Sequence, residues 1–234
     1  TADSGANKAL TLSGTATSEG FLALSTNGLY LTMAGYGAAP GTATVAQTDS
    51  TIVNRVVGRI EVSSGAIDTT TALTDAYTSG VAGSNANVRS AVSVDGTQFW
   101  TTGTAAAATT ASAGVRYSTL GGTTSTQISS TPTNVRVASI SGGQLYATTA
   151  SGSFVGVNSI GTGLPTGSGE TTTLLPGFSA ATGTGTASQY DFWFLDANTV
   201  YVADDRTQAS GGGIQKWLFN SGSANWELAY TLAT

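Results

Sequence analysis

Short runs of alternating apolar and polar residues, separated by turn residues, recur along the whole chain. The clearest series covers residues 190–195, 199–203, 213–219 and 225–232. Runs of this length that are rich in β-branched and aromatic residues are typical of strands and too short for helices. Asp and Asn at 196–198 and Asn, Ser and Gly at 220–222 favour tight turns. The pattern predicts four antiparallel strands joined mostly by short hairpins.

The same plan recurs three more times with weaker signals, and no segment has a convincing helical pattern. The first-hairpin turns of the four units fall at Gly28, Gly96, Gly143 and Asn198. A spacing of roughly 50 residues with four strands per unit is typical of a β-propeller. We therefore expect an all-β fold in which one domain, 1–234, contains four-stranded blades at about residues 20–75, 88–130, 135–176 and 190–232.

An internal match supports the propeller. The tripeptide Asn-Val-Arg ends at Arg89 in the second unit and at Arg136 in the third, seven residues before the hairpin glycine in both. The corresponding residue is Asp191 in the fourth unit and Phe21 in the first. A β-solenoid is the alternative that the small-residue composition also permits, but this register favours the propeller.

One predicted strand, residues 9–15, has no hairpin partner. It is either the outer strand of a preceding blade or the strand that completes the last one. A row of blades that does not close leaves an apolar flank exposed. We therefore expect the chain to be part of a larger propeller or to close by self-association.

Composition restricts the partners and the compartment. The net charge is -5, and Lys8 and Lys216 are the two lysines, which argues against binding to nucleic acid or an anionic membrane. No apolar run approaches the ~20 residues of a membrane-spanning helix. Few lysines and many Thr, Ser and Gly residues are typical of a bacterial extracellular or cell-surface protein. Because the chain starts at Thr1, we expect the numbering to begin inside a precursor.

Residues 200–217, VYVADDRTQASGGGIQKW, resemble a repeat of the NHL or YVTN-type propellers. In those repeats a YVAD strand and a short loop precede a strand with the pattern Ile-Gln-Lys-aromatic. The resemblance covers about one unit of four, and the loop is longer than the usual NHL loop. It implies the propeller architecture of bacterial extracellular proteins, but no particular reaction, since these families share a fold and differ in function.

Six charged residues are candidates for a binding site at the mouth of a propeller channel. Arg89, Arg136 and Asp191 belong to first strands, which line the channel, and Asp204, Asp205 and Arg206 belong to a loop on the same side. Two arginines at equivalent positions could bind a carboxylate, sulfate or phosphate through bidentate hydrogen bonds. Alternatively they pair with Asp191 or with backbone carbonyls and fasten one blade to the next.

Two further groups have both a ligand-binding and a structural interpretation. Asp204 and Asp205, with Asp196 and Asn198, could bind Ca²⁺ through oxygen ligands, or they could cap turns and form a surface ion pair with Arg206. No other cofactor is expected. The aromatic residues could stack on sugar rings or pack between blades; they are Trp193, Tyr201, Trp217, Trp226 and Tyr230.

Catalysis has little support in the residue inventory. The chain contains neither His nor Cys, its glutamates are scattered, and it has no Gly-x-Ser-x-Gly motif. We expect a secreted, non-catalytic binding or scaffold module that recognises a protein or a glycan. The alternative is a calcium-dependent hydrolase or lyase of the propeller lactonase type.

Overall fold

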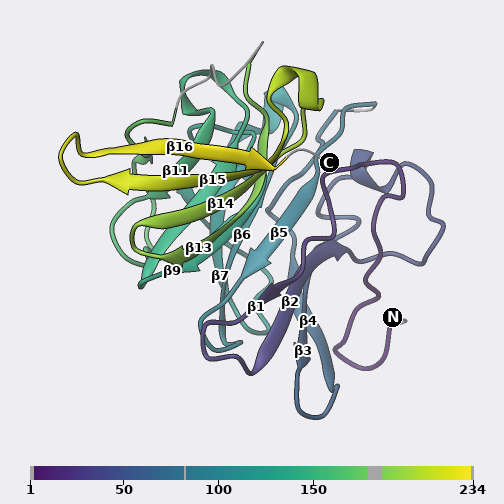
Figure 1. The fold of residues 1–234 in the computed structure, drawn as a ribbon. Coiled ribbons are helices and arrows are strands. Elements are labelled where there is room, and N and C mark those ends of the chain that lie inside the picture. The colour runs from purple at the N-terminus through teal and green to yellow at the C-terminus, as the bar shows by residue number, and fades with distance from the viewer. Residues whose placement is uncertain (1–2, 82, 179–185, 233–234) are drawn as a thin grey trace. The chain divides into compact units, whose positions relative to one another are not determined.

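A computed structural model describes residues 3–81, 83–178 and 186–232 of the chain. It contains four four-stranded antiparallel sheets, and each sheet is a meander whose strands follow one another in chain order (Figure 1). The helical segments among the described residues are four short 3₁₀ turns. None of the described helices is long and apolar enough to cross a bilayer. The all-β prediction with four-stranded, propeller-like blades is confirmed.

We call the sheets blades 1 to 4. Their strands are, in blade 1, β1 (Ala23–Leu24), β2 (Tyr30–Tyr36), β3 (Arg55–Glu61) and β4 (Ile67–Leu73); in blade 2, β5 (Val88–Val92), β6 (Gln98–Gly103), β7 (Gly114–Thr119) and β8 (Thr126–Ser129); in blade 3, β9 (Ala138–Ser141), β10 (Gln144–Thr149), β11 (Gly156–Ile160) and β12 (Thr172–Leu174); in blade 4, β13 (Gln189–Asp196), β14 (Thr199–Asp204), β15 (Gly213–Asn220) and β16 (Asn225–Leu232).

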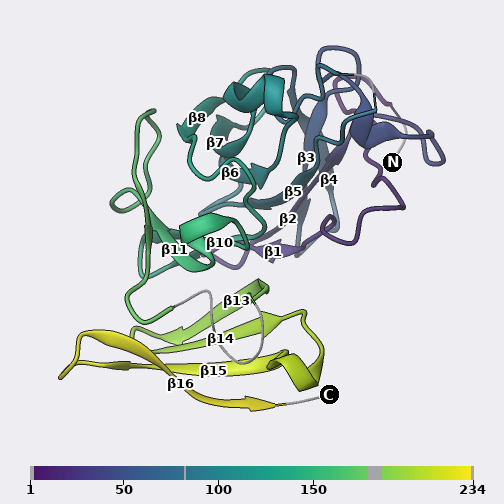
Figure 2. The same ribbon diagram turned by 90° about the horizontal axis from the view of Figure 1, so that it is seen from above.

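The chain divides into two compact units of two blades each. Unit 1 holds blades 1 and 2, and unit 2 holds blades 3 and 4. The unit boundary follows Asn134, and the short segment Thr166–Gly169 belongs to unit 1. Figure 2 shows the long, twisted strands of blade 4 from above. The expectation of a single domain stays a prediction.

The loop between the second and third strands carries a 3₁₀ turn in every blade: η1 (Val45–Gln47), η2 (Ala107–Ser112), η3 (Gly152–Phe154) and η4 (Gln208–Ser210). In blades 2, 3 and 4 the third strand then begins with Gly114, Gly156 or Gly213, all at positive φ. A Cβ atom at Gly114 would lie 2.2 Å from the carbonyl oxygen of Ser129. One at Gly213 would lie 2.3 Å from that of Leu232, so no larger residue fits there.

A buried polar side chain two residues after each of these glycines holds the loop. Arg116 donates to the carbonyl oxygen of Ala111 at 2.7 Å, Asn158 to that of Phe154 at 2.9 Å, and Gln215 to that of Gly211 at 3.2 Å. Blade 1 has a different arrangement in place of the glycine and the polar residue that follows it. There β3 begins with the buried Arg55, whose guanidinium donates to the carbonyl oxygens of Thr48 and Val53.

Within each unit the first blade packs on the second through one face. We call the side of blade 1 that packs on blade 2, and the side of blade 3 that packs on blade 4, the following face of that blade. The side of blade 2 or blade 4 in the same contact is its preceding face. In every blade the two names denote opposite sides of the sheet. In unit 1 the Thr32 hydroxyl of β2 donates to the carbonyl oxygen of Ala91 in β5, at 2.7 Å. In unit 2 the Tyr146 ring of β10 lies 4.7 Å from that of Phe194 in β13. The core of unit 2 continues to Phe178, which stacks on Trp217 at 4.4 Å.

The predicted strand at residues 9–15 is wrong. Only Thr11 pairs, in a single bridge to Tyr36 whose two backbone hydrogen bonds measure 2.9 and 3.0 Å. The chain then bends at Gly14, where φ is 71°, while the backbone N–H of Ser13 is bonded to the Glu19 carboxylate. This segment therefore covers blade 1 itself.

Candidate functional site

The six predicted site residues divide between the two units. Arg89 belongs to unit 1, and the other five belong to unit 2. Arg89 lies on β5, at a register irregularity between Val88 and Ser90, and its Nη1 donates to the Asn134 side chain. Arg89 is the last residue of the first Asn-Val-Arg segment, and Asn134 is the first residue of the second. The repeat of this tripeptide thus contributes a contact inside unit 1.

Arg136 fastens the start of blade 3 to the start of blade 4. Its guanidinium lies 4.6 Å from the ring centroid of Tyr190, and its Nη1 donates to the carbonyl oxygens of Ser188 and Gln189, at 3.2 and 3.1 Å. Asp205, whose side chain is 48% exposed, lies 3.9 Å from the same nitrogen. These contacts favour the blade-fastening interpretation of Arg136 over the anion-binding one.

Asp204 and Arg206 form a buried ion pair. The two carboxylate oxygens accept hydrogen bonds from Nε and Nη2 of Arg206, both at 2.8 Å. The same carboxylate also accepts from the backbone N–H groups of Ser188 and Arg206 and from the Gln215 amide. The pairing that the sequence suggested does form, but in the interior, where it anchors the loop that carries η4.

The four oxygen-bearing residues proposed for Ca²⁺ do not gather. Asp196 and Asn198 lie at the turn of the β13–β14 hairpin, whereas Asp204 pairs with Gln189 at the opposite end. Asn198 and Asp204, the nearest members of the two pairs, are separated by the length of β14, roughly 20 Å. Among residues 3–81, 83–178 and 186–232 there is no group of three or more His, Cys, Asp or Glu side chains that could hold a metal ion.

Asp191 lies beside the aromatic residues of blade 4. It lines a shallow cavity of about 180 Å³ together with Trp193, Tyr201 and Ile214. Partial burial raises the pKa of its carboxyl, and the hydrogen bond from the Phe192 backbone N–H at 2.8 Å opposes that effect. The carboxylate is therefore a polar group at an apolar surface.

The most exposed functional candidate is an aromatic row on the following face of blade 4. Trp193, Tyr201, Lys216 and Tyr230 are successive cross-strand partners on its four strands. Trp193 is 58% exposed and Tyr230 44%. The Lys216 ammonium lies 5.9 Å from the Tyr201 ring centroid and 5.8 Å from that of Tyr230. The row offers flat aromatic surface with a cation at its centre.

The two interpretations of the aromatic residues both hold, for different side chains. Trp217 and Trp226 are buried on the preceding face of blade 4, as packing between blades requires. Trp193 and Tyr230 face solvent. Strand alternation predicts that Trp193 and Tyr201 lie on the side of the sheet opposite to Trp217. It does not predict which of the two sides is covered by another blade.

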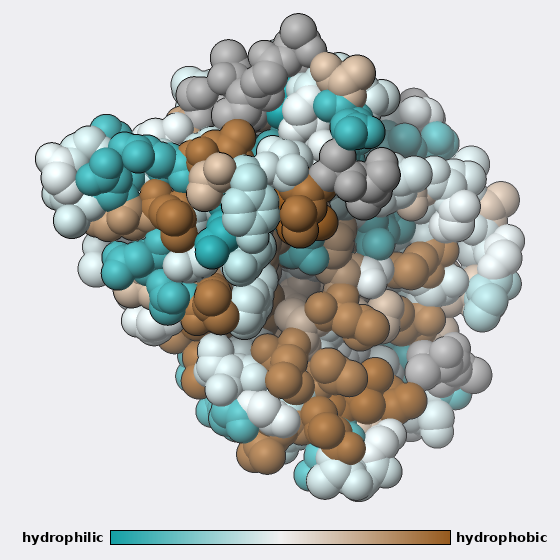
Figure 3. Space-filling model, in the orientation of Figure 1, coloured by the Kyte–Doolittle hydropathy of each residue, from teal (hydrophilic) through white to brown (hydrophobic). Residues whose placement is uncertain are grey.

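An apolar row lies on the preceding face of blade 1. Leu24, Leu31, Ile60 and Ile67 are successive cross-strand partners on its four strands. Leu24 is 58% exposed and Ile67 52%. Figure 3 shows hydrophobic side chains gathered in the lower part of the view, where β1–β4 lie in Figure 1. A surface of this kind marks an interaction site more often than an ordinary solvated face.

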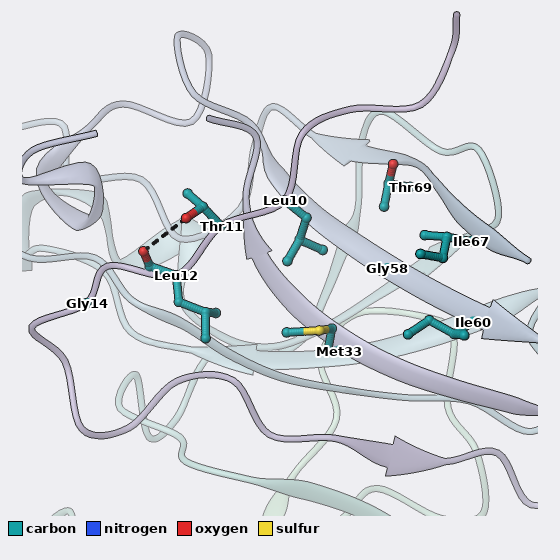
Figure 4. A pocket seen from close by; sticks show the side chains of 9 residues that line it. All are labelled: Leu10, Thr11, Leu12, Gly14, Met33, Gly58, Ile60, Ile67 and Thr69. Atoms are coloured by element: carbon teal, nitrogen blue, oxygen red, sulfur yellow. Dashed lines mark hydrogen bonds between the residues drawn. The ribbon is translucent and has the colours of Figure 1, made fainter. Parts of the chain in front are cut away.

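An apolar cavity of about 440 Å³ adjoins this row. In Figure 4, Leu10 and Leu12 of the N-terminal segment border it on one side, and Met33, Ile60 and Ile67 of blade 1 border it on the other. Leu10 fits closely over the backbone, because a Cβ atom at Gly58 would lie 2.9 Å from its Cδ1. The cavity contains no charged lining residue.

No protein-family model matches the chain, and no curated protein matches it significantly. The resemblance of residues 200–217 to NHL and YVTN-type repeats accordingly stays a prediction, as does the bacterial origin.

Proposed function

We propose that the chain is a non-catalytic binding or scaffold module whose recognition surface is the following face of blade 4. One observation carries the proposal: the residues Trp193, Tyr201, Lys216 and Tyr230 form a row across one sheet face, and the first and last side chains of the row are largely exposed. Exposed aromatic rings supply large contact areas at low cost in side-chain entropy, for proteins and for sugar rings alike.

The charged residues favour this surface as the recognition site, because their side chains are already used in contacts within the fold. Arg136 donates to the backbone carbonyl oxygen of Ser188, and Arg206 donates to the Asp204 carboxylate. Removing them from those contacts would leave buried polar groups without partners. Recognition through the aromatic row leaves these internal contacts intact.

The proposed setting is outside a bacterial cell. It rests on composition, since the chain has few lysines and many Gly, Ser and Thr residues. A protein or glycan ligand suits this setting, and the negative net charge of -5 disfavours nucleic acid as a partner.

Glycan and protein arrays probed with the labelled chain test the proposal. We expect binding that is lost in Trp193→Ser and retained in Ile52→Ser. The control residue Ile52 is 80% exposed in the loop between β2 and β3, so both substitutions remove an exposed apolar side chain. Binding that is equal in both variants, or no binding at all, would overturn the proposal. Calcium-dependent hydrolysis of a lactone panel would replace it with the enzymatic alternative.

A further inference from the structure

We propose that the following face of blade 4 docks on the preceding face of blade 1 of a second copy of the chain, in a head-to-tail arrangement. This inference rests on the proposed function, because it names the partner of the same aromatic face. It is carried by the contacts between blades that are already formed inside each unit.

The second strands show which residues make such contacts. Leu29-Tyr30-Leu31-Thr32 in blade 1 corresponds to Leu145-Tyr146-Ala147-Thr148 in blade 3 and to Val200-Tyr201-Val202-Ala203 in blade 4. Tyr30 lies against Gly96 of blade 2. Tyr146 lies against Phe194 of blade 4. Tyr201 has the same position on blade 4. The face of blade 4 that carries Tyr201 therefore corresponds to the faces that contact the next blade in blades 1 and 3.

The part of the preceding face of blade 1 that the N-terminal segment leaves exposed is the other half of this interface. In blade 4 the cross-strand pair Phe192 and Val202 lies on the preceding face, and only 6% and 0% of these residues are exposed. Leu24 and Leu31 are the corresponding pair in blade 1. Leu24 is nevertheless 58% exposed. A second copy supplies the missing sheet.

Both faces are largely apolar, and the face of blade 4 also carries Lys216 and Asp191. The strands of blade 4, which have six to eight residues each, cover a footprint of roughly 15 by 25 Å. Covering it on both partners removes on the order of 1,000 Å² of accessible surface, which is the lower range for a specific interface. The exposed Trp193 side chain faces an apolar surface with a recess, and the Lys216 charge is stabilised by the two flanking tyrosine rings.

Two charge-introducing variants test the arrangement. Trp193→Lys inactivates the face on blade 4, and Ile67→Lys inactivates the face on blade 1. Both residues are more than half exposed, so the core stays intact, which circular dichroism and a thermal melt would verify. Ile52→Lys, at an exposed site in the loop between β2 and β3 that belongs to neither row, is the matched control.

Light scattering coupled to size-exclusion chromatography, over a range of concentrations, gives the outcome. A head-to-tail interface predicts that the wild type and Ile52→Lys associate and that each of the other variants alone is monomeric. An equimolar mixture of Trp193→Lys and Ile67→Lys should have twice the monomer mass, because one intact junction remains. An interface in which one face docks on its own copy is lost in only one of the two variants, and an unrelated interface is lost in neither, so they do not give that pattern.

Other results would overturn the inference. They are a monomeric wild type, association that survives in either single variant, and a mixture that stays monomeric. If the wild type is monomeric while array binding still depends on Trp193, the inference fails and the proposed function stands. If Trp193-dependent binding is also absent, both fail.

Discussion

The Thr148 hydroxyl in β10 donates a hydrogen bond to the backbone carbonyl oxygen of Tyr190 in β13, at 2.5 Å. Thr32 and Ala91 make the same contact between β2 and β5. In both units a buried threonine of one second strand thus bonds to the first strand of the next blade. Packing between blades is apolar, and this hydrogen bond adds a directional element that fixes the register of one sheet on the next.

Replacing the hydroxyl of Thr148 with a methyl group should destabilise unit 2. Thr148→Val preserves the shape of a fully buried side chain and leaves the Tyr190 carbonyl without this donor. The expected loss in free energy of unfolding is about 1–2 kcal/mol, measured by urea denaturation. Thr148→Ser keeps the donor and loses only a methyl group, worth about 0.8 kcal/mol. A valine variant as stable as the wild type would show that burial alone holds the blades together.

Gln215 should control the stability of the loop that precedes β15. Its amide donates to the Gly211 carbonyl, and its oxygen accepts from the Trp217 indole N–H at 3.0 Å. Gln215→Leu leaves both groups buried without these bonds, and we expect a cost of about 2–3 kcal/mol. Faster proteolysis within residues 205–212 would locate the effect. Gln208→Ala, on the exposed part of the same loop, should change stability by less than about 0.5 kcal/mol.

The ion pair of Asp204 and Arg206 is expected to be coupled strongly. Asp204→Asn removes the charge that neutralises a guanidinium with only 9% exposure, and the expected cost is about 3 kcal/mol. Adding Arg206→Met should recover part of that loss, since no buried cation then remains. A double-mutant cycle by urea denaturation measures the coupling. Additive effects of the two substitutions would mean that the pair contributes no interaction energy.

Much of the architecture could be predicted from alternation and turn residues. The predicted strands of blade 4 begin and end within one residue of β13–β16, because strong aromatic alternation and Asp, Asn and Gly turns surround them. The strand predicted at residues 9–15 was wrong for a physical reason. Alternation signals an extended, half-covered chain, and that chain covers blade 1 through Leu10 with one bridge instead of a ladder.

The candidate site was less predictable, because the charges that attract attention in a sequence are those that the fold uses internally. Arg136, Asp204 and Arg206 are bonded within unit 2. Two further repeated patterns are visible in the sequence. In blades 2, 3 and 4 the third strand begins with a glycine, and a polar residue follows two positions later. In blades 3 and 4 the second strand carries a tyrosine at the same position, Tyr146 and Tyr201. The second of these identifies the docking face. Which faces remain exposed depends on the packing of whole sheets, which no local pattern encodes.

Alkaline pH should unfold the protein through Tyr36 and Tyr77. Burial raises the pKa of Tyr36 far above its ordinary value of 10.0, and the neighbouring Glu19 carboxylate raises it further. Burial likewise raises the pKa of Tyr77. The folded state then holds two protons that the unfolded state releases above about pH 10, so stability is complete below that pH and falls as the pH rises. Arg55 acts oppositely, since burial lowers its pKa to about 10, but one group opposes two.

Tyrosinate absorbance and urea midpoints, both followed against pH, measure this effect. Of the eight tyrosines, Tyr36 and Tyr77 should ionise only as the fold is lost. Tyr77→Phe should flatten the decline in stability above pH 10, because a phenylalanine has no proton to release. Ionisation of all eight tyrosines in the folded protein, with no change in the urea midpoint, would contradict the assignment.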